Sequence, residues 1–308
     1  MRIATELPAS DGVSAPRAES PWRRFASEFA QSRLALAGLG LLVAIILAAI
    51  AAPIISPQNP YDLAQLDVMD SKLPPGEQSS STGKTYWLGT DDQGRDMLSG
   101  IFYGLRISLV VGVSSTVIAL AIGLAMGLAA AYFGGWIDAL IMRIADIQLS
   151  FPGILIALIL LAVLGQGIDK IIAALVTVQW AYYARTVRSS ALVERQKEYV
   201  EAAQVLALSR TRIVFRHLLP NCLPPLIVVA TVQVAHAILL ESTLSFLGLG
   251  LPITEPSLGL LISNGFQYLL SGKYWISFYP GLALLLSILA INLVADQLRD
   301  VLNPRLSR

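Results

Sequence analysis

The sequence contains little charge, little cysteine and little histidine. Charged residues make up 14% of its 308 residues, and the net charge is +1. A balance this close to zero gives no support to nucleic-acid binding. The single cysteine, Cys222, excludes an intramolecular disulfide framework and a cysteine metal cluster. The two histidines, His217 and His236, lie far apart in the sequence.

Sequence motifs for nucleotide and hydrolytic chemistry are also absent. The chain has no GxxxxGK[ST] phosphate loop, no HExxH zinc motif and no GxSxG nucleophile motif. We therefore predict that it is not an enzyme by itself, with no catalytic residue, no metal-binding residue and no cofactor of its own. Any energy from ATP must come from a partner chain.

Apolar residues are plentiful. They make up 55% of the chain, and the mean hydropathy is +0.64, which is typical of a membrane protein rather than a soluble domain. A helix needs roughly 20 apolar residues to cross a bilayer. Six segments approach or exceed this length: Leu34–Ile55, Ile107–Phe133, Ile137–Leu164, Ile168–Ala184, Leu223–Leu249 and Ile276–Leu298.

These segments predict an all-α integral membrane protein with six transmembrane helices. Residues 1–33 form an N-terminal tail whose first 20 residues, rich in Ser, Pro and Ala, are expected to be disordered. Residues 34–55 form the first span, which we interpret as an uncleaved anchor rather than a secretory signal. A Pro/Gly/Ser-rich loop at 56–98 follows, and 99–308 holds the other five spans.

Lysine and arginine near the spans indicate the orientation, because they resist translocation. With a cytoplasmic N-terminus, most of them lie inside, including the cluster from Arg185 to Arg216. Both termini and this cluster are then cytoplasmic. The loops at 56–98 and about 250–275 are extracytoplasmic, and loops of such length are usually functional.

The most informative segment is the charged stretch from Glu198 to Asn221, within a polar loop at about 185–221. Its first half places Tyr199, Ala202, Ala203 and Leu206 at helical spacing, which predicts a narrow apolar stripe. Ser209 is a candidate N-cap of a second helix. A proline disfavours helix at the residue before it, so Pro220 is expected to end the unit. The pattern predicts a helical hairpin; a solvated loop that only enforces topology is the alternative.

The hairpin, with EAA at 201–203 and Leu219-Pro220 near its end, resembles the EAA loop of permease subunits in binding-protein-dependent ABC importers. Further stretches resemble the dipeptide, oligopeptide and nickel branch of that family, and the long loop after the first span resembles the second permease subunit type. These stretches are Leu88–Gly112, Met142–Leu158, Ser245–Pro252 and Asp296–Leu306.

The resemblance implies a prokaryotic plasma-membrane permease that forms half of a translocation path. Its implied partners are a second homologous permease subunit, two cytoplasmic ABC ATPases that bind ATP and Mg, and an extracytoplasmic solute-binding protein. The implied ATPase-coupling residues are Glu198, Glu201, Ala202, Ala203, Ala207, Ser209, Arg210, Leu219 and Pro220. Ala207 departs from the family, which usually has a glycine at this turn.

Several polar residues fall inside the predicted spans. Gln233 and Glu241 are candidates for the translocation path, with interhelical hydrogen bonding as the alternative. Asp146 lies three residues after Arg143, so a local ion pair is expected. Gly123 and Gly127 form a GxxxG pattern that predicts close helix packing.

The cargo implied by the resemblance is a di- or oligopeptide. Nickel, glutathione or another small solute fits the same architecture. An ion-driven secondary transporter is a different class, and it would have no use for a hairpin that docks an ATPase.

Overall fold

The computed structural model describes residues 21–62 and 66–302, except for the side chains of Pro21, Trp22, Arg24 and Arg210. The predicted disorder of residues 1–20 therefore falls outside the described part. Within these ranges the chain is helical without strands, and it contains two isolated antiparallel bridges, Gln78 with Thr85 and Thr90 with Asp96.

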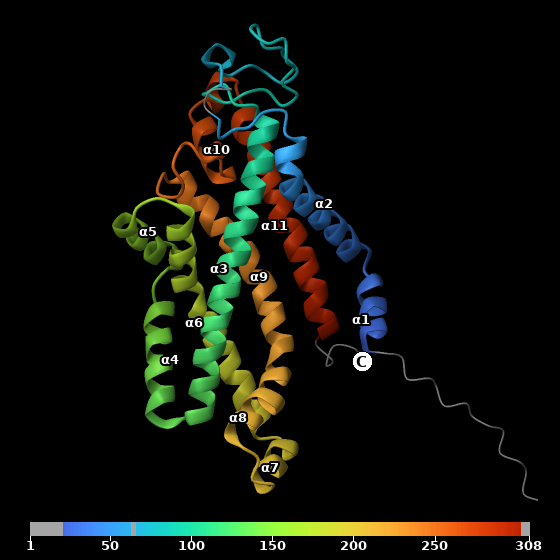
Figure 1. The fold of residues 1–308 in the computed structure, drawn as a ribbon, viewed down its shortest axis with the longest axis vertical. Coiled ribbons are helices and arrows are strands. Elements are labelled where there is room, and N and C mark those ends of the chain that lie inside the picture. Colours follow the sequence, from blue (N-terminus) through green and yellow to red (C-terminus); the bar gives the residue numbers. More distant parts are fainter. Residues whose placement is uncertain (1–20, 63–65, 303–308) are drawn as a thin grey trace, which may run out of the picture.

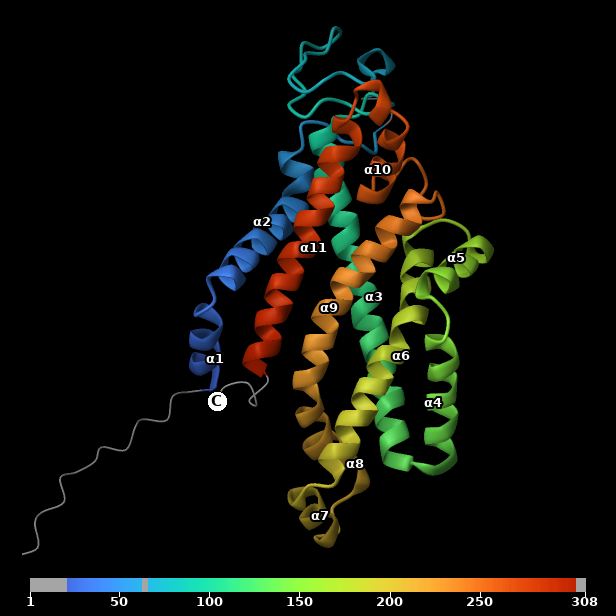
Figure 2. The same ribbon diagram turned by 180° about the vertical axis from the view of Figure 1, so that it is seen from behind.

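The helices follow one another in a single bundle, drawn in Figures 1 and 2. Their bounds are α1 Pro21–Ala30, α2 Arg33–Ile55, η2 Val68–Asp70, α3 Met97–Phe133, α4 Gly135–Leu149, α5 Gly153–Leu164, α6 Ile168–Arg195, α7 Glu198–Val205, α8 Arg210–Arg212, η3 Ile213–Leu218, α9 Leu219–Phe246, α10 Leu258–Phe266, η4 Leu269–Ser271 and α11 Trp275–Leu302.

Helix α3 runs through the middle of the bundle and packs against α2, α6, α9 and α11 (Figure 1). It begins at Met97, ten residues before the predicted apolar span, because the side chain of Asp96 caps it by accepting from Ser99 N. The 56–96 segment and α10 lie at one end of the long axis, and α7 and α8 lie at the other.

Close packing of α3 on α6 confirms the prediction from the glycine pair. A Cβ on Gly123 would lie 2.4 Å from Tyr183 Cβ, and one on Gly127 would lie 2.5 Å from the Ala184 carbonyl oxygen. Both glycines are therefore required to let the two backbones approach.

The apolar segment 137–164 is not one straight helix. Helices α4 and α5 are bent by 90° at the short break between them. Pro152 stands just before α5, and it disfavours helical geometry at Phe151. The break therefore follows from the proline.

Four of the described helices are long and apolar enough to span a membrane, or five if the bent pair is one span. They are α2, α3, the helix that runs from Ile213 to Phe246, and α11. Helix α6, the predicted fourth span, is not among them. It is continuous through Gln179 and Trp180, and the Gln179 side chain is buried against α3, where Thr116 Oγ1 lies 3.4 Å from its Oε1.

Candidate functional site

The segment from Glu198 to Leu218, here called the α7–α8 segment, projects beyond the bundle at the end opposite the 56–96 segment (Figure 1). Glu198 and Glu201 lie in the first turn of α7, where carboxylates interact favourably with the helix dipole. Both are exposed, as are Ala202, Ala207 and Ser209. The side chain of Arg210 lies outside the described part of the chain.

The buried face of α7 differs from the predicted stripe. Val200 and Ala203 are buried, and they pack on Ile213 and Leu218 of η3. Of the predicted stripe, Tyr199, Ala202 and Leu206 are exposed and only Ala203 is buried. The prediction was wrong because helical spacing alone does not show from which side a partner element approaches. Here η3 covers the Val200 side.

The exposed face of the α7–α8 segment is rich in apolar side chains. Val205 is 86% exposed, Leu206 73% and Phe215 64%. Large exposed apolar side chains on a projecting segment are typical of an interaction surface, and Val205 and Leu206 are adjacent at the end of α7. Phe215 lies instead in a pocket that residues of α3, including Leu128 and Phe133, also line.

The turn after α7 keeps the left-handed conformation even though it has no glycine. Ala207 has φ 55°, and the hydrogen bonds Leu208 N to Ala203 O (3.1 Å) and Ala207 N to Gln204 O (2.9 Å) form a Schellman motif. Leu208 packs in the same apolar cluster as Ala203, which is the hydrophobic contact that accompanies this motif. The turn therefore has the geometry a glycine would give, with an alanine in a strained position.

Ser209 occupies the N-cap position before α8, and its carbonyl accepts from Ile213 N at 3.1 Å. Its hydroxyl lies 3.4 Å from Thr211 Oγ1. The backbone position fits the prediction, whereas the recorded hydroxyl partner is a side chain rather than a first-turn amide.

Pro220 does not end the segment. The prediction was wrong, because Leu219 is helical (φ −54°, ψ −50°) and the helix continues from Ile213 to Phe246. Residues 213–218 form a π-helical stretch, in which Leu219 N donates to Val214 O. The wider π turn leaves room for the proline ring and tolerates the missing N–H. The α7–α8 segment is thus continuous with the long helix α9.

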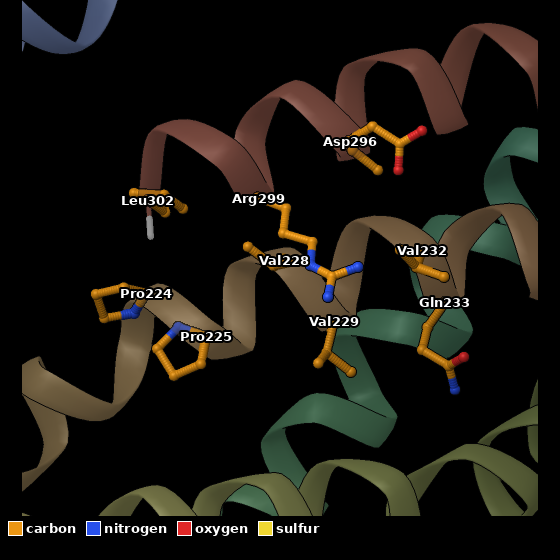
Figure 3. Close-up of a pocket in the computed structure, with 10 residues that line it drawn as sticks. Pro224, Pro225, Val228, Val229, Val232, Gln233, Asp296, Arg299 and Leu302 are labelled. Carbon is orange, nitrogen blue, oxygen red and sulfur yellow. The ribbon is translucent and has the colours of Figure 1, made fainter. Parts of the chain in front are cut away.

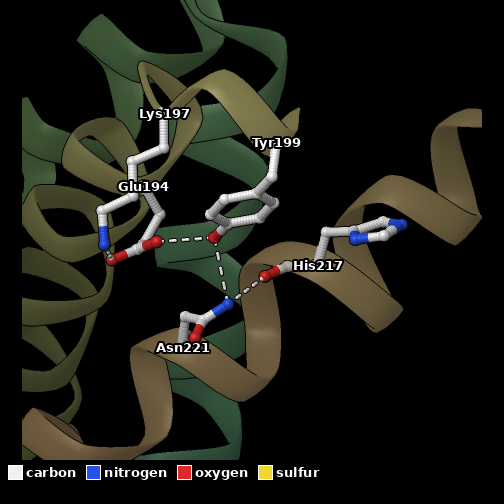
Figure 4. A network of polar contacts seen from close by, with 5 residues as sticks. All are labelled: Glu194, Lys197, Tyr199, His217 and Asn221. Carbon is white, nitrogen blue, oxygen red and sulfur yellow. Dashed lines mark hydrogen bonds and ion pairs between the residues drawn. The ribbon is translucent and has the colours of Figure 1, made fainter. Parts of the chain in front are cut away.

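Polar contacts fasten α7 to the two long helices beside it (Figure 4). The Tyr199 hydroxyl donates to Glu194 Oε2 (2.6 Å), and Asn221 Nδ2 donates to the same hydroxyl (3.0 Å). Glu194 Oε1 also accepts from Lys197 Nζ at 2.5 Å. Although the Tyr199 side chain is exposed overall, partial desolvation and the adjacent Glu194 carboxylate raise its pKa to about 12, so the hydroxyl remains a donor at neutral pH.

Glu241, a candidate for the translocation path, is fully buried. Its carboxylate accepts hydrogen bonds from Ser108 of α3 (3.0 Å) and from Ser242 (3.3 Å) and Ser245 (2.8 Å) of α9. This is the interhelical hydrogen-bonding arrangement that the sequence left open as the alternative. The carboxylate joins α9 to α3 and has no open surface.

Gln233 lies beside a groove of about 590 Å³ between α9 and α11 (Figure 3). The groove is lined by valines and two prolines of α9, and by Asp296 and Arg299 of α11. The Arg299 side chain reaches from α11 toward α9. Among the predicted path residues, Gln233 is therefore the one that borders an open space.

Helix α4 is tied to α6 by ion pairs that the sequence did not predict. Asp146 pairs with Arg185 rather than with the nearby Arg143, and Asp138 pairs with Arg188. The expected Arg143–Asp146 pair was wrong because a partner on another helix cannot be seen in a helical repeat. In residues 21–62 and 66–302, no group of three His, Cys, Asp or Glu side chains is placed to hold a metal ion.

Comparison with known proteins identifies the family of this chain. A family described as binding-protein-dependent transport system inner membrane component matches residues 119–308, and the N-terminal TM domain of oligopeptide transport permease C matches residues 20–75. The chain belongs to this inner membrane component family. The first match includes the α7–α8 segment and α9, and the second includes α2.

Relatives in the family extend over nearly the whole chain. A dipeptide transport system permease protein of Alkalihalophilus pseudofirmus is 37% identical over 94% of this chain and 91% of its own length. A di/tripeptide transport system permease protein of Pseudomonas aeruginosa is 37% identical over 93% of each.

A solved structure supports the fold alone. An inward-facing structure of the MetNI methionine ABC transporter is similar with a TM-score of 0.55 and 21% identity. The similarity covers 67% of this chain and 98% of that one.

Proposed function

We propose that the chain is a permease subunit of an ATP-driven importer, forming half of the path for di- and oligopeptides that an extracytoplasmic binding protein delivers. The observation that carries this proposal is the full-length similarity to permeases named for dipeptide and di/tripeptide transport. The 37% identity extends along almost the whole chain, so it covers the helices of the proposed path as well as the segments outside the membrane. A shared class of cargo is therefore the simplest expectation.

The proposed topology has six spans: α2, α3, the bent α4–α5 pair, α6, α9 and α11. Helix α6 counts as a span because it packs along α3 and buries its own polar residues, such as Gln179, against that helix. The excess of arginine around α7 and both chain ends puts them on the cytoplasmic side of a prokaryotic plasma membrane. The 56–96 segment then faces the binding protein.

The α7–α8 segment is the proposed dock for one of two cytoplasmic ATPases, with a second homologous permease completing the assembly. Exposed Val205 and Leu206, at the end of α7, would enter an apolar groove, which is how an amphipathic helix binds a partner. ATP and Mg would be bound by these ATPases, because the chain has no phosphate loop.

The proposed path runs beside Gln233, along the groove between α9 and α11. Glu241 contributes as a buried brace between α3 and α9 rather than as a cargo ligand. Nickel, glutathione or another small solute remains the alternative cargo, and competition by these solutes against a labelled dipeptide separates the possibilities.

The test uses proteoliposomes that hold the chain with its second permease, its ATPases and its binding protein. Reversing the exposed charge of Glu201 (Glu201→Arg) should leave assembly intact and uncouple ATP hydrolysis from dipeptide uptake. The matched control is Asp300→Arg, a charge reversal at an exposed residue near the end of α11. It should transport as the wild type does.

Normal transport by Glu201→Arg would contradict the coupling role. Uptake that collapses with a proton or sodium ionophore, and persists with a hydrolysis-deficient ATPase, would replace the proposal by an ion-driven transporter.

A further inference from the structure

Two of the eight residues of α7, Val200 and Ala203, are buried. Helix α7 has eight residues, and an isolated helix of that length is marginal in water. Its buried apolar side chains, Val200 and Ala203, pack on Ile213 and Leu218, which belong to the same projecting segment. Apolar packing therefore joins α7 to η3, and Val214 of η3 packs in turn against the apolar cluster of α3, α6 and α9. The apolar link from α7 to the long helices is thus indirect.

Tyr199 adds a direct polar link from α7 to the long helices through one atom. A tyrosine hydroxyl donates one hydrogen bond and accepts others. Here it donates to Glu194, in the last turn of α6, and accepts from Asn221, in the first turn of α9. A single oxygen thus connects α7 with α6 and α9 (Figure 4). Glu194 is 5 positions from Tyr199 in the chain, and Asn221 is 22 positions from it.

The two partners of this hydroxyl are themselves held in place. Asn221 Nδ2 carries two N–H groups, and besides Tyr199 it donates to the His217 carbonyl oxygen at 2.7 Å. Glu194 Oε1 pairs with Lys197, which leaves Oε2 for Tyr199. The link to α9 also bridges the π-helical stretch at 213–218, the least regular part of the helix that connects α8 to α9.

We propose that Tyr199 is a positioning residue that transmits movement of α7 to the ends of α6 and α9 together. This inference rests on the proposed coupling function. Without the hydroxyl, α7 stays attached to η3 by its apolar contacts, but it can tilt against α6 and α9 when an ATPase moves it. Hydrolysis would then continue while the long helices respond less.

The test compares Tyr199→Phe with Tyr182→Phe in the complete complex in proteoliposomes. Tyr182 is an exposed tyrosine of α6 whose hydroxyl makes no hydrogen bond within the described part of the chain. The measured quantity is the number of dipeptides transported per ATP hydrolysed, together with the melting temperature and the amount of ATPase that co-purifies.

In Tyr199→Phe the transport-to-hydrolysis ratio should fall at least about fivefold, the low end of measured couplings between sites, with ATPase binding and melting temperature unchanged. Asn221→Ala keeps the Tyr199–Glu194 bond and breaks the link to α9, so it should lower the same ratio. The double variant should be no worse than the more affected single variant, because both changes remove one connection.

An unchanged ratio in Tyr199→Phe, or an equal fall in Tyr182→Phe, would overturn the inference. A lower melting temperature with an unchanged ratio would also overturn it, because Tyr199 would then be only structural. Wild-type vesicles without ATP-dependent uptake would instead refute the proposed function itself, which is a separate result.

Discussion

The two ends of the molecule differ in secondary structure and in which side chains they bury. The 56–96 segment has little regular structure, yet Thr90, Asp91, Arg95 and Asp96 are almost completely buried in it. Among the described residues, Asp91 Oδ2 and the Nε and Nη1 of Arg95 have no hydrogen-bond partner, whereas Thr90 is well paired. Its hydroxyl donates to Asp70 O and accepts from Leu73 N, and its carbonyl accepts from Trp275 Nε1. The α7–α8 segment is mostly helical, yet it leaves Val205, Leu206 and Phe215 exposed.

This difference shows that regular secondary structure does not determine whether a segment can pair its polar groups and bury its apolar side chains within its own chain. An irregular segment is stable alone when its buried polar groups find partners inside the chain. A helical segment with its backbone bonds satisfied still lacks a partner when its apolar side chains remain in water. Thr90 meets the first condition, whereas Asp91 and Arg95 keep some buried polar atoms without a partner among the described residues. The α7–α8 segment, with its exposed apolar side chains, is the end that we propose docks another protein.

The largest expected effect tests how tightly the 56–96 segment is built. A Cβ on Gly94, which has φ +78°, would lie 2.2 Å from the Asp67 carbonyl oxygen. Gly94→Ala should therefore destabilise this end by about 4 kcal/mol or more, from backbone strain and overlap together. A steep fall in melting temperature and in membrane accumulation would show it.

Gly76→Ala is the matched control, because Gly76 also has a positive φ (+86°) but nothing lies within 4 Å of an added Cβ. It should cost only about 1 kcal/mol. Equal losses in the two variants would mean that the segment is looser than its contacts indicate.

A second prediction concerns charge buried in the same segment. Burial raises the pKa of Asp91 from 3.8 to about 6, against the opposing effect of the hydrogen bonds from Arg95 N and Gln93 N. The folded chain holds this proton more tightly than the unfolded chain, so the contribution of Asp91 to stability is fully present below about pH 4 and is lost, by about 3 kcal/mol, as pH rises through 6.

Asp91→Asn keeps an oxygen acceptor for the two backbone amides and removes the titration. The melting temperature of the variant, relative to the wild type, should rise between pH 4 and pH 7. Parallel melting curves across that range would contradict the prediction.

The smallest expected effect compares one turn at each end. Ala207 after α7 and Gly248 after α9 hold the same left-handed position in Schellman motifs, with φ 55° and 79°. Ala207→Gly should stabilise its turn by about 1 kcal/mol, and Gly248→Ala should destabilise the other by a similar amount. Hydrogen exchange of the amides at residues 206–208 and 247–249 measures both changes. Effects of the same sign would refute the equivalence.

Part of the architecture could be predicted from the sequence, because long apolar runs and glycine pairs act locally. The spans in α2, α9 and α11 and the Gly123–Gly127 packing were found in this way. The helical pattern of α7 was also predicted, whereas the hairpin and its coupling role stay a proposal.

Features that depend on a distant partner could not be predicted. The buried face of α7 depends on η3, and the partner of Asp146 is on α6. The serines around Glu241 come from two helices. The prediction that Pro220 ends the segment was wrong because a proline disrupts the hydrogen bonds of an α-helix, whereas the stretch before Pro220 is π-helical.

The glycine seam between α3 and α6 limits how this protein can change shape. Tyr183 and Ala184 of α6 lie so close to Gly123 and Gly127 that sliding either helix along the other would bring Cβ atoms onto the opposite backbone. We therefore expect α3 and α6 to move together as one rigid unit. Ion pairs of Arg185 and Arg188 with α4 join that helix to the unit. If the chain opens and closes as the proposed importer function requires, its hinges are expected outside this contact between α3 and α6.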